Sequence, residues 1–355
     1  MSCSSAASTS AKSGLSAIRC THIPHQVPYL LGLSLQEHLV SRRARAREFL
    51  SQQPSQGPHS GHSKPAASYE RASSIAHTDH LLLLEHTPVY TEGRRQSSTE
   101  LSGNEQEGNR LRALGADYVQ TRRGGLVTYH GPGQLVGYPI WDIGAMDLST
   151  RCYVDKIQAA LTKLLHSAPY HLSTVPAQSD ETGVWSDISH KIASIGIQVR
   201  HRITSHGFAL NVGMHVLPWF EHIVACGIVG KGMTSIERER ALLIKREEET
   251  RPDRGAADSV EEGRVKALEE QAERQGLVQP QDSGRRDPRE SAKLFVGPES
   301  RTKVEDVVPN LVQHFSSTFG REIIPAPATQ FVYQADAQGV LAGVTVDGED
   351  INVTQ

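Results

Sequence analysis

The middle of the chain carries two stretches in which apolar side chains alternate with polar or small ones. Apolar residues occupy every second position over 193–199 and again over 208–212. A period of two is typical of a strand with one buried face. We therefore predict an antiparallel pair of strands joined near 201–205. The unbroken apolar run 81–84 predicts a further, buried strand.

The stretch 122–140, RRGGLVTYHGPGQLVGYPI, combines two short apolar runs with glycine and proline. A strand cannot continue through Gly131, Pro132 and Gly133, because proline lacks the ladder donor and glycine adds no packing. The stretch therefore predicts a strand, a tight turn and a second strand. Gly124 and Gly125 have no side chains, so their backbone can approach a ligand closely. The arginines, glycines and histidine gathered here favour a binding site over a purely structural turn.

Helices are predicted where apolar residues recur at helical spacing, over 29–49, near 150–165 and over 304–319. Ser149 or Thr150 can cap the second of these helices. Strands followed by helices indicate a mixed α/β fold. Near the C-terminus, apolar pairs on both sides of Asp347 and Gly348 indicate a hairpin.

Other segments lack such a pattern. Residues 51–68 are low in complexity, residues 97–109 are polar, and about half of the residues over 238–290 are charged. Segments of this composition cannot bury an apolar face. We predict a low-complexity insertion at 51–75, a loop at 97–109, and a charged insertion at 237–298 that is disordered or forms a solvated helix.

Composition and charge narrow the class of protein. The net charge of -3 excludes a globally basic nucleic-acid-binding protein. Four cysteines are too few and too scattered for a disulfide scaffold. No apolar run approaches the roughly 18 residues needed to span a bilayer. Residues 1–20 are rich in Ser and Ala, contain Lys12 and Arg19 and have no acid, which favours a mitochondrial transit segment over a plain disordered terminus.

Cys226 and Lys191 are the candidates for chemistry, although each alone has a simpler interpretation. A free cysteine is more often a small buried hydrophobic residue, and a lysine is most often solvated at the surface. Together they suit acyl transfer through a thioester, because a nearby ammonium raises the thiolate fraction and a neutral amine can accept a proton. The histidines form no metal-binding pattern, and no phosphate-loop or dinucleotide-binding motif occurs.

Four blocks of the sequence resemble, in the same order, the lipoyl(octanoyl) transferase family. They are TPVYTEGRR at 87–95, RRGGLVTYHGPGQLVGYPI at 122–140, GVWSDISHKIASIGIQV through HGFALNV at 183–212, and ACGIVGKGMTSI at 225–236. The segment after Val304 resembles the closing helix of that family. The resemblance implies an α/β fold of the biotin/lipoate protein ligase-like catalytic domain, a mixed sheet with flanking helices. This domain would cover residues 21–325, between the transit segment at 1–20 and a C-terminal tail at 326–355.

The resemblance also implies roles for individual residues. Cys226 would carry the acyl group as a thioester, and Lys191 would lower the pKa of that thiol and transfer protons. Small residues in the acyl-binding segments would leave room for an alkyl chain, whose burial contributes roughly 0.8 kcal/mol per CH₂. No cofactor and no metal ion is expected. The implied acyl-binding residues are Arg123, Gly124, Gly125, Leu126, Val127, Thr128, Tyr129 and His130, then Ser194, Ile195 and Gly196, and finally Gly207, Phe208 and Ala209.

The activity implied by the resemblance is transfer of an octanoyl group from octanoyl-acyl carrier protein to a lysine of lipoate-dependent proteins, in protein lipoylation and lipoate biosynthesis. The implied acceptors are lipoyl-domain proteins such as the glycine cleavage H protein and the E2 subunits of 2-oxoacid dehydrogenases, in the mitochondrial matrix. Two alternatives are an ATP-dependent lipoate–protein ligase and a catalytically inactive module that binds carrier protein. Arg94, Arg95, Arg122 and Arg123 are either a basic rim that steers an acidic carrier protein or solvated loop charges.

Overall fold

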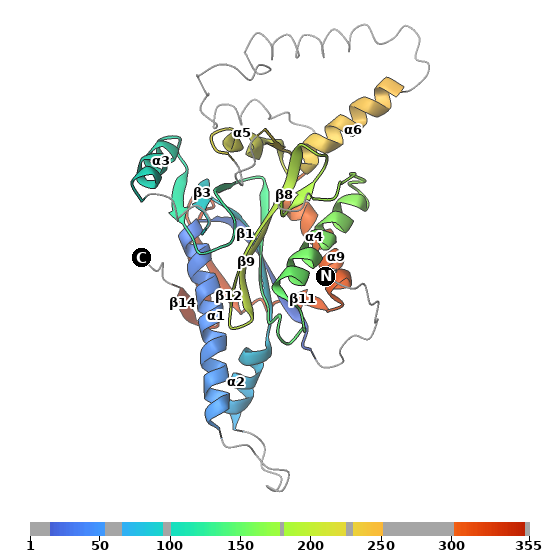
Figure 1. The fold of residues 1–355 in the computed structure, drawn as a ribbon. Coiled ribbons are helices and arrows are strands. Elements are labelled where there is room, and N and C mark those ends of the chain that lie inside the picture. Colours follow the sequence, from blue (N-terminus) through green and yellow to red (C-terminus); the bar gives the residue numbers. More distant parts are fainter. Residues whose placement is uncertain are drawn as a thin grey trace.

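A mixed sheet of eight strands runs through the centre of the molecule (Figure 1). The computed structural model describes residues 15–53, 66–94, 101–177, 181–224, 230–250 and 302–351. Seven strands follow the order β10-β8-β9-β6-β2-β1-β11, and β7 pairs with β8. The strands of this sheet are β1 (Ile18–Val27), β2 (His80–His86), β6 (Gln134–Ile140), β7 (Val184–Trp185), β8 (His190–Arg200), β9 (Ile203–Asn211), β10 (Gly232–Met233) and β11 (Ile323–Pro325).

The alternating stretches form the antiparallel pair β8 and β9, as their pattern predicts. Their turn lies at His201 and Arg202, which both have positive φ. The buried strand predicted at 81–84 is β2, which pairs in parallel with β1 and antiparallel with β6. Leu81 and Leu83 pack into one apolar core, whereas Leu82 and Leu84 pack into another. The run is unbroken because both faces of β2 are covered.

Helices cover both faces of the central sheet (Figure 1). On one face, α4 (Thr150–His166) and α9 (Val304–Phe319) pack around Trp141, whose ring lies 4.7 Å from that of Phe319. On the other face lies α1 (Tyr29–Gln52), which buries Leu31, Leu35 and Leu39. These three helices occupy the segments where the sequence predicts them. The Ser149 side chain accepts a hydrogen bond from the backbone N of Cys152 and caps α4, as expected.

The stretch 122–140 is divided between two sheets. Its second strand is β6 of the central sheet, whereas its first is β5 (Thr128–His130) of a small sheet with the order β4-β3-β5. In this small sheet β3 (Val89–Glu92) pairs in parallel with β4 (Asp117–Gln120) and antiparallel with β5. The glycine pair lies in the loop that leads into β5 and is not part of a strand.

The segment predicted as a C-terminal tail is folded against the domain. The strands β12 (Phe331–Ala335), β13 (Leu341–Val346) and β14 (Glu349–Ile351) form an antiparallel sheet. The predicted hairpin across Asp347 and Gly348 is confirmed, and both residues have positive φ. Apolar side chains of this sheet, among them Phe331 and Val346, share a core with α1 and β1. The tail is therefore part of the fold, because it covers apolar surface of α1.

Three segments that lack a strong apolar pattern are nevertheless helical. The prediction of a loop at 97–109 is wrong, because α3 (Leu101–Ala113) begins within this segment. The helix buries Leu111 against Tyr90 and Trp219. The predicted insertion 51–75 ends within α2 (Ala67–His77), which packs Ala72 and Ala76 against α1. The predicted insertion 237–298 begins as α6 (Ile236–Thr250), so its described start takes the helical one of the two predicted forms. Residues 251–301 lie outside the described part of the chain.

Two remaining features complete the fold. A short 3-10 helix (Met214–Val216) runs into α5 (Leu217–Phe220) after β9. At the N-terminus, β1 already begins at Ile18, so the last three residues of the predicted transit segment belong to the sheet. Among the described residues, no helix has both the length and the apolar character needed to cross a membrane.

Candidate functional site

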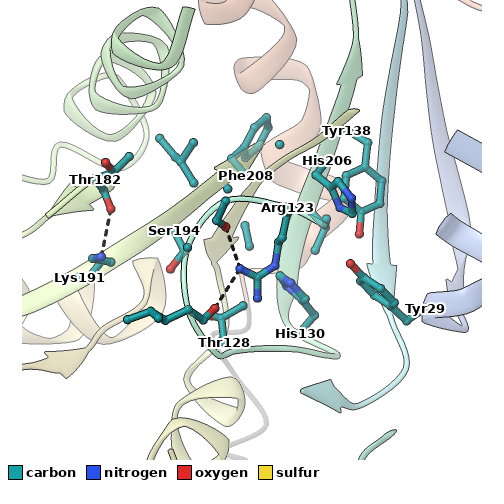
Figure 2. A pocket seen from close by; sticks show the side chains of 18 of the residues that line it. Tyr29, Arg123, Thr128, His130, Tyr138, Thr182, Lys191, Ser194, His206 and Phe208 are labelled. Atoms are coloured by element: carbon teal, nitrogen blue, oxygen red, sulfur yellow. Dashed lines mark hydrogen bonds between the residues drawn. The ribbon is translucent and has the colours of Figure 1, made fainter. Parts of the chain in front are cut away.

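A pocket lies where the glycine-rich loop meets β8 and β9, close to the start of α1. Figure 2 shows Arg123 in its middle, with Lys191 and Thr182 to one side and Tyr29, Tyr138 and His206 to the other. The pocket is lined by Tyr29, Arg123, Gly124, Gly125, Leu126, Thr128, His130, Val136, Tyr138, Glu181, Thr182, Lys191, Ser194, Ile195, Gly196, His206, Gly207, Phe208 and Ala209.

Arg123 holds the glycine-rich loop in shape. Its guanidinium donates to the carbonyl oxygens of Gly124 and Leu126 over 3.1 and 3.0 Å (Figure 2). It also donates to the carbonyl and hydroxyl oxygens of Thr91 in β3, over 2.6 and 2.8 Å. The side chain is 7% exposed, so it is neither a rim residue nor a solvated loop charge. The rigid fork of donors suits such a set of acceptors.

Gly196 allows this loop to lie directly on β8. A Cβ atom at Gly196 would stand 2.8 Å from the Gly124 carbonyl oxygen, and the Gly124 N–H donates to the Ile197 carbonyl over 3.0 Å. On its other side the loop meets Gly93, where a Cβ would stand 2.3 Å from the Gly125 carbonyl oxygen. The glycines were expected to admit a ligand. They also admit neighbouring backbone.

Glycine is required at position 207 for a different reason from the one that the sequence suggested, which was room for an alkyl chain. A Cβ at Gly207 would lie 2.1 Å from the Gly137 carbonyl oxygen on β6, so glycine is required by close strand packing. A Cβ at Gly137 would in turn collide with the Phe208 ring, at 2.2 Å. The room for an alkyl chain therefore does not follow from the absence of a side chain at Gly207.

His130 is the end of a buried hydrogen-bond chain. Its Nδ1 lies 2.7 Å from Gln134 Oε1, and Gln134 Nε2 donates to Asn211 Oδ1 over 2.9 Å. Asn211 Nδ2 then donates to the Thr234 carbonyl over 2.9 Å. Burial, followed by the nearby His86 and Arg123, holds the pKa of His130 well below its usual value. His130 is therefore a neutral imidazole in the wall of the pocket, tied to the segment that follows residue 229.

Aromatic and histidine side chains form the wall beside α1. The Tyr29 and His130 rings are stacked with centroids 6.1 Å apart, and the Tyr138 hydroxyl lies 2.6 Å from His86 Nε2. His86 Nδ1 lies 2.7 Å from the Val27 carbonyl, so Nδ1 is the donor and Nε2 accepts from the tyrosine. Burial lowers the pKa of His86 to about 4.

His206, on β9, completes this wall. Its φ of 55° lies in the left-handed region, which is uncommon for a residue within a strand. Its backbone N–H donates to Gln36 Oε1 of α1 over 2.7 Å. Burial lowers the pKa of His206 to about 3. Strained backbone conformations cluster at functional sites. Here the left-handed conformation directs the backbone N–H of His206 toward α1.

Lys191 lies on the opposite side of the pocket and is 2% exposed. Its Nζ donates to the Thr182 carbonyl over 3.1 Å and stands 4.8 Å from the centre of the Trp185 ring. Lys231 approaches the same ring at 4.8 Å, and its Nζ pairs with Glu181 over 2.7 Å. The solvated surface lysine considered for position 191 is thus excluded.

The structure brings most of the sequence-predicted residues to this pocket, with three exceptions. Cys226 lies outside the described residues. Val127 does not line the pocket, and Tyr129 points away from it, since its ring stacks on Trp219 at 5.0 Å. Tyr29, Tyr138, His206, Glu181 and Thr182 line the pocket without having been predicted. Tyr138 and His206 lie in stretches that the sequence analysis singled out, but nothing in the sequence distinguished their side chains, and the other three come from segments without such a signal. The described residues hold no cluster of side chains suited to a metal ion.

Comparison with known proteins relates this site to a family. A model of the lipoyl protein ligase A/B catalytic domain matches residues 67–251. The mitochondrial octanoyl-[acyl-carrier-protein]:protein N-octanoyltransferase of Danio rerio is 46% identical over 170 residues, which are 48% of this chain and 70% of the relative. The chain belongs to the octanoyltransferases of this family. The octanoyltransferase of Alkaliphilus metalliredigens is 43% identical over 159 residues, 45% of this chain and 70% of that protein.

The fold of this octanoyltransferase family member agrees with the fold class expected from its sequence, a ligase-like catalytic domain with a mixed sheet and flanking helices. A solved putative lipoate protein ligase from T. acidophilum aligns with 88% of either chain, with a TM-score of 0.42 and 10% identity. The family match spans the pocket-lining segments from Arg123 to Ala209. Of the pocket residues, Tyr29 alone precedes the matched range.

Proposed function

We propose that this chain transfers an octanoyl group from octanoyl-acyl carrier protein to a lysine of a lipoyl-domain protein, through a thioester on Cys226. Family membership supports the octanoyltransferase activity in protein lipoylation. The observation that carries the chemistry is the buried Lys191 amine in the wall of the pocket. A lysine is rarely buried at such a place without a task in binding or proton transfer.

In the first step the Cys226 thiolate attacks the carbonyl carbon of the carrier thioester. The tetrahedral intermediate collapses, the bond to the carrier sulfur breaks, and the carrier thiolate takes up a proton. Lys191 assists by stabilising the thiolate of Cys226 and by supplying that proton. The products are S-octanoyl Cys226 and free carrier thiol.

In the second step the neutral amine of the acceptor lysine attacks the octanoyl thioester. The carbon–sulfur bond breaks, an amide forms, and the proton lost by the amine returns to the Cys226 sulfur by way of Lys191. The backbone N–H groups near Cys226 or in the glycine turns are candidates for stabilising the oxyanion. The cycle consumes no ATP, which distinguishes it from that of a lipoate–protein ligase.

The decisive experiment is intact mass spectrometry after mixing the protein with octanoyl-acyl carrier protein in the absence of ATP. We expect one added octanoyl group on the wild-type protein and none on Cys226→Ala. Cys20→Ala is the matched control, because burial raises the pKa of the free Cys20 thiol to about 12 and leaves it unreactive. An adduct that persists in Cys226→Ala, or an absolute need for ATP, would overturn the proposal. Binding of carrier protein without any adduct would favour the inactive binding module.

The partners and the location of the protein belong to the same proposal. Mitochondrial relatives support a mitochondrial matrix location, although a bacterial relative is of similar identity. Arg94 and Arg122 are exposed and remain as a rim that attracts an acidic carrier protein, whereas Arg95 lies outside the described residues. Reversing the charge of Arg122 should raise the KM for carrier protein and flatten its dependence on salt. A fluorescent fusion that stains the cytosol alone would exclude the matrix location.

A further inference from the structure

A second pocket lies far from the first, between the C-terminal half of α1, α2 and the C-terminal sheet. Its volume is about 470 Å³. In Figure 1, α2 packs beside the end of α1 that is remote from β8 and α5. The pocket is lined by four arginines (Arg19, Arg42, Arg43 and Arg71), together with His80 and Gln330.

The sheet sets one wall of this pocket by its register. Arg19 of β1 pairs with His80 of β2, and His80 pairs in turn with Ile140 of β6. Side chains at paired positions of neighbouring strands point to the same face. Arg19 and His80 therefore stand side by side near the starts of two interior strands, beneath α1 and α2. This wall is built from extended backbone.

The positive charge of the pocket is only partly balanced by carboxylates. Arg42 pairs with Asp347, and Arg43 donates to Asp79 over 2.6 Å. Within the ranges that the structure describes, the guanidinium groups of Arg19 and Arg71 make no hydrogen bond or ion pair. Two arginine side chains thus face one pocket without a counter-charge.

Two buried polar atoms at the pocket also lack partners. His80 is 8% exposed, and its Nδ1 has no hydrogen bond within the described part of the chain. Gln330 Oε1 is in the same condition, although Gln330 Nε2 donates to Asp347 over 3.3 Å. Asp347 can only accept, so the amide cannot turn to satisfy its oxygen. Unpaired buried polar atoms are uncommon, and a bound ligand is one reason for them.

We propose that this pocket binds a small phosphate-bearing molecule. Phosphate oxygens match the planar donor fork of arginine, and Arg19 and Arg71 would hold the anion from β1 and α2. The imidazole of His80 would donate one further hydrogen bond. Gln330 Oε1 would accept from a hydroxyl group, either of the phosphate itself or of the alcohol that it esterifies.

The site is separate from the acyl-transfer pocket. Tyr29 and Arg42 lie at the two sites and on the same helix, which rises about 1.5 Å per residue, so they are about 20 Å apart. The strand β2 also runs between the two regions, with His80 of the second pocket at one end and His86, which contacts the first-pocket residue Tyr138, at the other. Occupancy of the second site is therefore measurable without touching a residue of the first.

The test is isothermal titration of inorganic phosphate and of glycerol 3-phosphate into the full-length protein at constant ionic strength. We expect saturable binding of one equivalent, weakened about tenfold or more by Arg19→Gln or Arg71→Gln, because each substitution removes a charge-assisted hydrogen bond. Arg151→Gln, an exposed arginine of α4, is the matched control and should bind as the wild type does.

The titrations of the two ligands and of the arginine variants have three informative outcomes. Tighter binding of glycerol 3-phosphate than of inorganic phosphate would identify a phosphate ester as the ligand. Binding that is equal in the wild type, Arg19→Gln and Arg71→Gln would overturn the proposal, as would the absence of binding at millimolar phosphate. Circular dichroism of the variants ensures that any loss of binding reflects the pocket and not unfolding.

Discussion

His130 and Gln134 are linked across the turn between β5 and β6, with Nδ1 and Oε1 2.7 Å apart. The orientation of the amide is determined by its other contact, because Gln134 Nε2 faces the Tyr129 carbonyl, which can only accept. His130 must therefore carry its proton on Nδ1, and its Nε2 is left as an acceptor. The pocket wall thus holds one defined tautomer.

Replacement of Gln134 by leucine should destabilise the protein. It leaves the Nδ1–H of His130 and the Oδ1 of Asn211 buried without their partner, and each loss costs about 1–3 kcal/mol. We expect the free energy of unfolding, measured by urea titration, to fall by about 2–6 kcal/mol. Gln334→Leu, at an exposed position of β12, should change it little. Equal stability of the two variants would show that the hydrogen-bond chain contributes nothing.

Stability should decrease as the pH falls below the ordinary pKa of histidine. The pKa of His86 is lowered to about 4 by burial, so between pH 6.5 and 4 the unfolded chain binds a proton at this residue that the folded protein does not bind. Proton binding therefore stabilises the unfolded state relative to the folded state as the pH falls. From pH 6.5 to 5, His86 alone should remove about 2 kcal/mol of stability.

The variant His86→Gln checks this assignment. Its unfolding free energy should depend less steeply on pH over this window than that of the wild type, whatever its absolute stability. His77→Gln, an exposed position at the end of α2, serves as the control and should keep the wild-type slope. A slope unchanged in His86→Gln would mean that other groups cause the loss.

Gly196→Ala should displace the glycine-rich loop. The new Cβ would lie 2.8 Å from the Gly124 carbonyl, closer than real contacts allow, so the loop or β8 must shift. Overpacking of this kind costs about 1–3 kcal/mol. We expect slower formation of the octanoyl-enzyme in the mass assay, because the pocket is rearranged. Gly343→Ala places its Cβ 3.3 Å from a flexible glutamine side chain and should leave the rate unchanged.

Arg123→Lys should reduce both stability and activity strongly, although it conserves the charge. Lysine keeps the positive charge but cannot reach Thr91, Gly124 and Leu126 together. We expect a loss of about 2–4 kcal/mol in unfolding free energy, together with loss of octanoyl-enzyme formation. The neighbouring Arg122→Lys, at an exposed position, should behave as the wild type. Full activity of Arg123→Lys would refute a positioning role for the guanidinium.

The sequence by itself determined the elements with strong periodicity. The alternation over β8 and β9, the apolar run of β2 and the helical faces of α1, α4 and α9 are local patterns, and burial of one face follows directly from them. The glycines and the proline of 122–140 correctly placed the turn before β6. These signals lie within short windows, where local conformation and burial act together.

Tertiary structure decided what depends on distant partners. The helix α3 carries little apolar surface of its own, yet Leu111 is buried by Tyr90 and Trp219. The C-terminal sheet is part of the domain because α1 offers it an apolar face. In both cases the stabilising contact lies far away in the chain, so the local composition predicted a loop or a tail.

The pocket depends both on local sequence and on tertiary structure. The glycine-rich loop and the strand 193–199 were recognisable as parts of a site from their own residues. The burial of Arg123, the tautomer of His130 and the approach of Tyr29 depend on partners that only folding brings together, and no spacing along the chain encodes them. Side-chain chemistry is local in the sequence, whereas the distances and the burial that control its reactivity belong to the tertiary structure.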